Sequence, residues 1–164
     1  MAGDANPREA VEIREFQFVQ DGSLVVEILR QSKQATLWTE TDLLLLRTLS
    51  GGSAFVSLAN GRVSGVIMGR IAADEAEILN LAVREDDRRK GAGKRLVHRL
   101  LSEFYAKGVT RVFLEVRESN RAAIAFYESL SFRHVGRRKG YYYDPVEDAL
   151  VMERTLENST ALPG

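Results

Sequence analysis

The spacing of hydrophobic residues changes along this chain between the period of a helix and the period of a strand. Residues 92–107 carry apolar side chains three and four positions apart, which is typical of an amphipathic helix that Gly108 ends. In residues 110–117, apolar and polar side chains alternate strictly, as they do in a half-buried strand. A well-marked helix followed directly by a well-marked strand predicts a domain of the mixed α/β class.

The same patterns over the whole chain predict seven strands and four helices. Asn60-Gly61 is a type I′ turn sequence and is expected to join two of the strands as a hairpin. Thr39 or Thr41 is expected to cap the second helix. The expected strands are one from Val11 and those at 54–58, 63–71, 77–83, 110–117, 132–138 and 149–156; the expected helices are one from about Gln20, one from the threonine cap to Leu49, and those at 92–107 and 121–130.

The chain has 164 residues, which is enough for a single domain with a substantial core. No internal repeat or linker interrupts it, so we expect one domain over residues 11–157, with flexible tails at 1–10 and 158–164. Lys+Arg and Asp+Glu both number 23, and the formal net charge is zero. Because a neutral protein has no long-range field of one sign, a nucleic-acid partner is not expected.

The sequence has no cysteine and only two histidines, His98 and His134. This excludes disulfides and a covalent acyl-thiol intermediate, and it argues against a metal site. The first ten residues are polar, unlike a secretory signal, and apolar runs such as 43–46 are too short to cross a bilayer. We therefore expect a cytoplasmic protein without a metal and without a membrane partner.

Residues 88–93, with the sequence RRKGAG, form a basic glycine turn between an expected strand and an expected helix. The first N–H groups of a helix have no intrahelical partners and carry partial positive charge, so such a turn is suited to bind an anion. The two known nucleotide motifs fit poorly: a P-loop needs Ser or Thr where Arg95 stands, and a dinucleotide fingerprint needs glycine where Leu96 stands. By itself the turn is equally consistent with a flexible loop of solvated charges.

This turn resembles the R/Q-x-x-G-x-G/A motif with which the GNAT acetyltransferase superfamily binds the pyrophosphate of coenzyme A. The resemblance extends over residues 75–156, through EAEILNLAV, LEVRESNRAAIAFYESLSF and RRKGYYYDPVEDALVM. In this region the chain is similar to the branch that acetylates the N-terminal alanine of bacterial ribosomal proteins. The N-terminal half is similar more loosely, through its strand–helix–helix order and the segment Trp38-Thr39-Glu40.

The resemblance implies a single-domain GNAT fold, in which helices flank a central, mixed and largely antiparallel twisted sheet. It also implies an N-acetyltransferase that uses acetyl-CoA as co-substrate and acts as a monomer or weak dimer. The implied acceptor is a protein N-terminus, such as that of a ribosomal protein starting with alanine. Without cysteine, direct attack in a ternary complex is expected. The alternatives are an acetyltransferase for a small amine or an internal lysine, and a non-catalytic acyl-CoA-binding module.

Two glutamates are candidates for the general base that accepts the proton of the amine. The resemblance gives this role to Glu115, while Glu77 stands at the base position of the histone-acetylating branch. Either could instead be a strand carboxylate paired with an arginine, since Arg111 and Arg117 share a strand face with Glu115.

The resemblance makes Tyr127 the general acid that protonates the departing thiolate. A phenol has an ordinary pKa of about 10, so we expect Tyr127 to donate its proton without strong perturbation. The alternative is a core aromatic that packs beside Phe126. Leu81 and Val83 are implied to offer backbone groups to the acetyl-pantetheine arm, and Asn120 to contact the coenzyme as well as cap a helix. The full set assigned to the coenzyme is Leu81, Ala82, Val83, Arg88, Arg89, Lys90, Gly91, Ala92, Gly93, Lys94 and Asn120.

Residues 139–148 are expected to form an aromatic, acidic loop that closes over the acceptor. The residues that the resemblance implies for binding the acceptor are Trp38, Tyr141, Tyr142 and Glu147. Alternatively, Trp38 packs between helices and the loop residues lie on a hairpin surface. The chain departs from the usual family sequence in having a third tyrosine, Tyr143, which leaves acceptor selection open.

Overall fold

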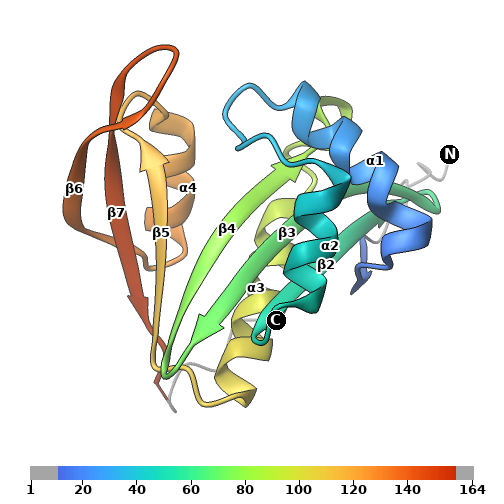
Figure 1. Ribbon diagram of the computed structural model, residues 1–164, viewed down its shortest axis with the longest axis horizontal. Coiled ribbons are helices and arrows are strands. Elements are labelled where there is room, and N and C mark those ends of the chain that lie inside the picture. Colours follow the sequence, from blue (N-terminus) through green and yellow to red (C-terminus); the bar gives the residue numbers. More distant parts are fainter. Residues whose placement is uncertain (1–10, 158–164) are drawn as a thin grey trace, which may run out of the picture.

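A computed structural model describes residues 11–157 and shows one seven-stranded sheet with helices on both faces (Figure 1). The expected mixed α/β fold, with seven strands and four helices, is confirmed; the two expected tails lie outside the described residues. The strands are β1 (Glu12–Glu15), β2 (Gly52–Ala59), β3 (Arg62–Ala72), β4 (Glu75–Val83), β5 (Arg111–Arg117), β6 (Arg133–Tyr142) and β7 (Glu147–Thr155). The helices are α1 (Phe18–Gln31), α2 (Glu40–Thr48), α3 (Ala92–Ala106) and α4 (Arg121–Ser129), with a short 3₁₀ turn, η1, at Glu85–Asp87.

The sheet has the strand order β1-β2-β3-β4-β5-β7-β6 and is antiparallel except for one pair. That pair is β4 and β5, which are connected by η1 and α3 and run parallel. A parallel connection needs a crossover segment, usually a helix, and α3 supplies it. The crossover therefore places the first turn of α3 beside the end of β4.

Two hydrophobic clusters hold the helices against the sheet. The larger lies between the sheet and α3 with α4, and includes Leu96, Leu100 and Phe104. The smaller lies under α1 and α2 and contains Ile28 and Leu43. Burying a large aliphatic or aromatic side chain contributes about 1.5–3 kcal/mol to the free energy of unfolding, so these clusters fix the helix positions.

The cap of α2 forms at Thr39, which is one of the two expected positions. The Thr39 hydroxyl accepts from the backbone N–H of Asp42, and the Asp42 carboxylate accepts from the N–H of Thr39 at 2.7 Å. This reciprocal capping box satisfies two N–H groups that the helix leaves without partners. The first helix begins at Phe18, two residues before the expected start at Gln20.

The expected loop at 139–148 is wrong, because most of it is strand. β6 continues to Tyr142 and β7 begins at Glu147, so the connection is only residues 143–146. The side chains of β6 are mostly exposed along its length, since it is the edge strand of the sheet. An edge strand with few buried positions has little alternation of hydrophobic and polar residues. Because the prediction of strands relied on that alternation, it ended this strand too early.

β4 contains one extra residue opposite β3. Met68 pairs with Asn80 and the next residue, Gly69, pairs with Ile78, so Leu79 is a bulge. A bulge bends its strand and increases the local twist. The pairing of β4 with β5 ends at Ile78 with Leu114, and beyond this point the two strands separate, as Figure 1 shows. The middle of the sheet is therefore open at one end.

Gly69 sits opposite this bulge, where α3 approaches the sheet closely. A Cβ atom at Gly69 would lie 2.6 Å from Cζ of Phe104 and 2.9 Å from the backbone oxygen of Glu77. We expect Gly69→Ala to lower the free energy of unfolding by about 1–3 kcal/mol, because an overpacked core must shift. Denaturant unfolding measures this. At Gly136, also in a strand, a Cβ would meet only ordinary contacts of 3.8 Å or more, so Gly136→Ala is the control. Equal stability of the two variants would contradict the close packing.

Candidate active site

A cleft of about 780 Å³ lies where β4 and β5 separate. Its walls come from segments far apart in the sequence: the end of β4, the turn before α3, the end of β5, the start of α4, and the loop that follows α1. Of the residues expected at the site, thirteen line it: Leu81, Ala82, Val83, Arg88, Arg89, Gly91, Ala92, Gly93, Lys94, Glu115, Asn120, Tyr127 and Tyr142. Lys90, Trp38, Tyr141 and Glu147 are not part of the lining.

The glycine turn delivers the first N–H groups of α3 to one end of the cleft. Gly91 is the N-cap with φ of 87°, a left-handed conformation that glycine adopts without strain, and no side chain caps the helix. A Cβ on Gly91 would meet no atom within 4 Å, so the glycine is required by the backbone angle and leaves open space beside it. This end of α3 has the geometry of an anion site.

Asp87 explains why only part of the basic run faces the cleft. Its buried carboxylate pairs with Arg62 at 3.1 Å and with Lys90 at 3.5 Å, which turns Lys90 back toward the protein. Arg88 instead donates from Nε to the carbonyl oxygen of Val83 at 3.0 Å. The turn is thus anchored by one acid and one backbone carbonyl, and Arg88 is held at the mouth of the cleft.

The β4 wall presents backbone that has no strand partner on the side of β5. Beyond Ile78, the bulge residue Leu79 has no partner in β3 and residues 80–83 still pair with β3, but no residue of β5 pairs with residues 79–83. The buried side chain of Asn80 also lines the cleft and donates to the carbonyl oxygen of Thr36 at 2.7 Å. This bond fixes the loop after α1 over the cleft.

The opposite wall brings together Asn120 and Tyr127 from α4. Asn120 caps the helix by accepting from the N–H of Ala123 at 3.2 Å. Tyr127 is only 8% exposed and packs edge-on against Phe126 and Phe132, so it is a core aromatic as well as a cleft residue. The expectation of an unperturbed phenol is wrong: burial raises the pKa of Tyr127 well above its ordinary value.

Glu115 is paired with an arginine, but with neither of the two on its own strand. Oε1 of Glu115 lies 2.6 Å from Nε of Arg138 in β6. Arg111 pairs with Glu75, and Arg117 pairs with Glu147. The sequence could not show this partner, because Arg138 comes from a strand that lies two positions away in the sheet.

Glu77 lies near Glu115 without lining the cleft. Burial raises the pKa of the Glu77 carboxyl, and the charge of Glu115 raises it further. Arg70, at 3.8 Å, opposes the shift. The carboxylate of Glu115 also acts on the nearby hydroxyl of Tyr141 and raises the pKa of Tyr141 to about 12. Glu115 is therefore the carboxylate that lines the cleft, and Glu77 is a second carboxylate near it that does not.

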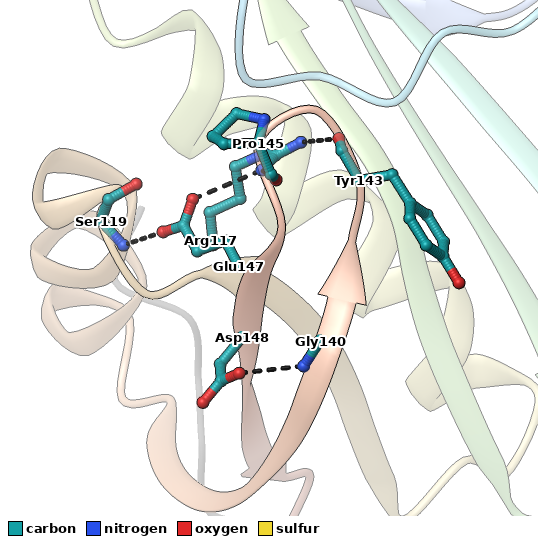
Figure 2. A network of polar contacts seen from close by, with 7 residues as sticks. All are labelled: Arg117, Ser119, Gly140, Tyr143, Pro145, Glu147 and Asp148. Atoms are coloured by element: carbon teal, nitrogen blue, oxygen red, sulfur yellow. Dashed lines mark hydrogen bonds and ion pairs between the residues drawn. The ribbon is translucent and has the colours of Figure 1, made fainter.

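Glu147 and Asp148, at the start of β7, are both hydrogen-bonded to other parts of the protein (Figure 2). Glu147 accepts from the backbone N–H of Ser119 at 2.6 Å and from Arg117 at 3.3 Å. Asp148 accepts from the backbone N–H of Gly140 at 2.9 Å. These contacts favour the structural alternative for Glu147, whose charge is already compensated.

The structure adds lining residues that the sequence patterns did not indicate. They are Gln31 at the end of α1, the loop 32–36 that follows it, Ile78, Leu79, Asn80, Glu85, Asp87, Leu114, Val116, Arg117, Ala122, Ala123 and Phe126. The loop has no regular hydrophobic spacing, and only the buried amide of Asn80 reveals why it stays over the cleft. Trp38 lies beyond this loop in a neighbouring groove with Leu37 and Leu45, and its ring packs against the smaller core.

Among residues 11–157, no group of three or more His, Asp or Glu side chains is arranged to hold a metal ion. No helix in this part of the chain is long and apolar enough to cross a membrane. The cleft presents the N–H groups at the start of α3 at one end and the carboxylate of Glu115 and the phenol of Tyr127 on its walls.

A splayed parallel pair in a mixed sheet, with a helix N-terminus at its open end, forms a cleft suited to an elongated ligand that carries an anionic group. The sequence pattern of the acetyltransferase (GNAT) family matches residues 23–132, which is more than half of the chain. The chain belongs to this family.

Several relatives share the same name. The [ribosomal protein bS18]-alanine N-acetyltransferase of Escherichia coli (strain K12) is 42% identical over 95 residues, which are 57% of this chain and 64% of that protein, or less than two thirds of its length. The protein of the same name from Salmonella typhimurium (strain LT2) is 36% identical over 131 residues, 76% of this chain and 84% of its own. The crystal structure of the ribosomal-protein-S18-alanine N-acetyltransferase from Escherichia coli is similar, with a TM-score of 0.81 and 30% identity, over 94% of this chain and 99% of that one.

Proposed function

We propose that this protein transfers the acetyl group of acetyl-CoA to the N-terminal α-amino group of a protein, and that the acceptor is a ribosomal protein that begins with alanine. The observation that carries the proposal is the cleft itself, which leads from a helix N-terminus to the carboxylate of Glu115 and the phenol of Tyr127. The names of the relatives support the choice of acceptor.

The residues of the turn fit the pyrophosphate of coenzyme A. The N–H groups at the start of α3 supply a site for the phosphates, and Gly91 leaves the space that a side chain would fill. The unpaired β5-facing edge of Leu81–Val83 offers backbone groups to the acetyl-pantetheine arm, in the manner of an added strand. A free N–H on this edge would also stabilise negative charge on the thioester oxygen.

The acceptor amine needs to lose a proton, and the thiolate needs to gain one. An α-amino group has an ordinary pKa of about 7.7–8.0, against about 10.4 for lysine, so a carboxylate such as Glu115 is a sufficient base for the first. The raised pKa of Tyr127 keeps its hydroxyl protonated across the neutral range. Tyr127 therefore donates a hydrogen bond to the sulfur as the C–S bond breaks and then gives its proton to the departing thiolate. Because the chain has no cysteine, the amine attacks acetyl-CoA directly.

The acceptor class is tested by mass spectrometry on synthetic peptides that vary in their first two residues, each with a free and a blocked N-terminus. We expect one acetyl group on the free α-amine, fastest when alanine is first, and none on internal lysines. Acetylation of lysine or of small amines alone would show that the acceptor is not a protein N-terminus. Coenzyme binding without any transfer would indicate a non-catalytic acyl-CoA-binding module.

The two proposed catalytic groups should give different pH profiles. Glu115→Gln is expected to lower kcat about 100-fold near pH 7 and to recover in part at higher pH, where the amine is neutral without help. Tyr127→Phe is expected to lower kcat about 100-fold at every pH while acetyl-CoA binds normally, because only the hydroxyl is lost. Tyr105→Phe, on the exposed side of α3, is the control. Near-normal turnover of Tyr127→Phe would remove Tyr127 as the acid.

Gly91 and Gly61 allow backbone strain to be separated from coenzyme binding. Both have positive φ, 87° and 73°, and a Cβ would meet no atom within 4 Å at either. We expect each alanine variant to lose about 1–2 kcal/mol of stability, because both positions are left-handed. Only Gly91→Ala should also weaken coenzyme A binding, measured by titration calorimetry, since Gly61 lies in the β2–β3 turn. Equal affinities in the two variants would contradict a pyrophosphate site at α3.

A further inference from the structure

The carboxylate of Glu115 is already occupied on two sides by groups from the edge strand. Nε of Arg138 lies 2.6 Å from its Oε1, and Tyr141 lies close enough for the carboxylate to raise the pKa of the Tyr141 hydroxyl. The side chain of Glu115 is 14% exposed, whereas that of Arg138 is 59% exposed. The arginine thus covers the carboxylate from the solvent side and has room to move away from it.

The charges around this pair come from the neighbouring strands β3, β4, β5 and β7. β4 contributes Glu77, whose partner Arg70 comes from β3 at 3.8 Å. β5 contributes Arg117, whose guanidinium lies 4.3 Å from the ring of Tyr142 and pairs with Glu147. Val151 of β7, opposite Glu115 in the sheet, is apolar. Arg138 is therefore the cation in direct contact with Glu115, and the other two arginines are paired with other acids.

An α-amine with a pKa of about 7.7–8.0 arrives largely as a cation at pH 7. This ammonium ion must approach the carboxylate of Glu115, which is already paired with Arg138. A positive charge close to an ammonium group disfavours the protonated form, so an amine bound beside Arg138 loses its proton more readily. The same charge weakens the attraction of Glu115 for the ammonium ion.

We propose that Arg138 is a positioning residue that holds Glu115 in the free enzyme and selects the neutral form of the acceptor amine beside it. This inference rests on the proposed acetylation of an α-amine and adds a residue that controls its protonation state. Arg138 acts through Glu115 and through its charge, not by contact with acetyl-CoA. Its effect should therefore appear in the pH profile and in the division between KM and kcat.

Arg138→Gln removes the charge and should change three quantities for an alanine-first peptide. KM for the peptide is expected to fall severalfold, because the ammonium ion no longer competes with the arginine. kcat near pH 7 is expected to fall severalfold, because the bound amine stays protonated. The pH at which kcat reaches half of its maximum should rise by about half a unit, the size expected for one partly exposed ion pair. Arg138→Lys keeps the charge and should restore the wild-type profile.

Arg137→Gln is the matched control, since it removes the same charge from the neighbouring position of β6. Arg137 pairs with Glu118 at 2.7 Å and with Asp148 at 3.1 Å, and not with Glu115. We expect this variant to keep the wild-type KM and pH profile, even if its melting temperature falls as much as that of Arg138→Gln. A readout of stability alone would not separate the two variants, whereas the pH profile does.

The outcomes distinguish this inference from the proposed function. If wild-type protein acetylates α-amines but Arg138→Gln has the same KM and pH profile as Arg137→Gln, the inference is wrong and the proposed function stands. If Arg138→Lys behaves like Arg138→Gln, geometry rather than charge is responsible, and the inference is again wrong. If the wild-type protein acetylates no α-amine, both are wrong.

Discussion

The bulge at Leu79 is the constraint on which the functional half of the molecule depends. Because β4 has one residue more than β3 requires at this point, it bends away from β5 directly after their last pair, Ile78 and Leu114. Continuous pairing would fill the space between the two strands with hydrogen bonds. The bend instead leaves a backbone edge without a strand partner and a cleft of about 780 Å³ beside it. The crossover helix α3 then places its N-terminus at the open end.

The two ends of the cleft differ in local charge, although the chain has no net charge. The chain is neutral overall, but the turn before α3 concentrates basic residues and uncapped N–H groups at one end. Glu115 lies toward the other end, with Glu77 near it. One charged side chain near each end is held in an ion pair: Lys90 pairs with Asp87, and Glu115 pairs with Arg138. The arrangement suits a co-substrate with phosphates at one end and a reaction with an amine at the other.

The sequence predicted the elements whose hydrophobic pattern is strong and missed features that depend on distant neighbours. The start of α3 at residue 92 and the alternation in β5 were both evident, because each side chain there is buried or exposed according to its period. The extension of β6 to Tyr142 was missed because an edge strand buries little. The pairing of Glu115 with Arg138 was missed because β7 lies between their strands in the sheet, and strand order is not visible in periodicity. The loop at 32–36 could be assigned to the site only from the structure, in which Asn80 donates to Thr36.

A crystal structure of the protein with acetyl-CoA is the most direct test of this account. We expect the pyrophosphate within hydrogen-bonding distance of the N–H groups that start α3, and the pantetheine arm between β4 and β5 along Leu81–Val83. The acetyl group should then lie between Glu115 and Tyr127. Binding of acetyl-CoA elsewhere on the protein, or closure of the gap so that β4 and β5 pair beyond Ile78, would contradict the central claim.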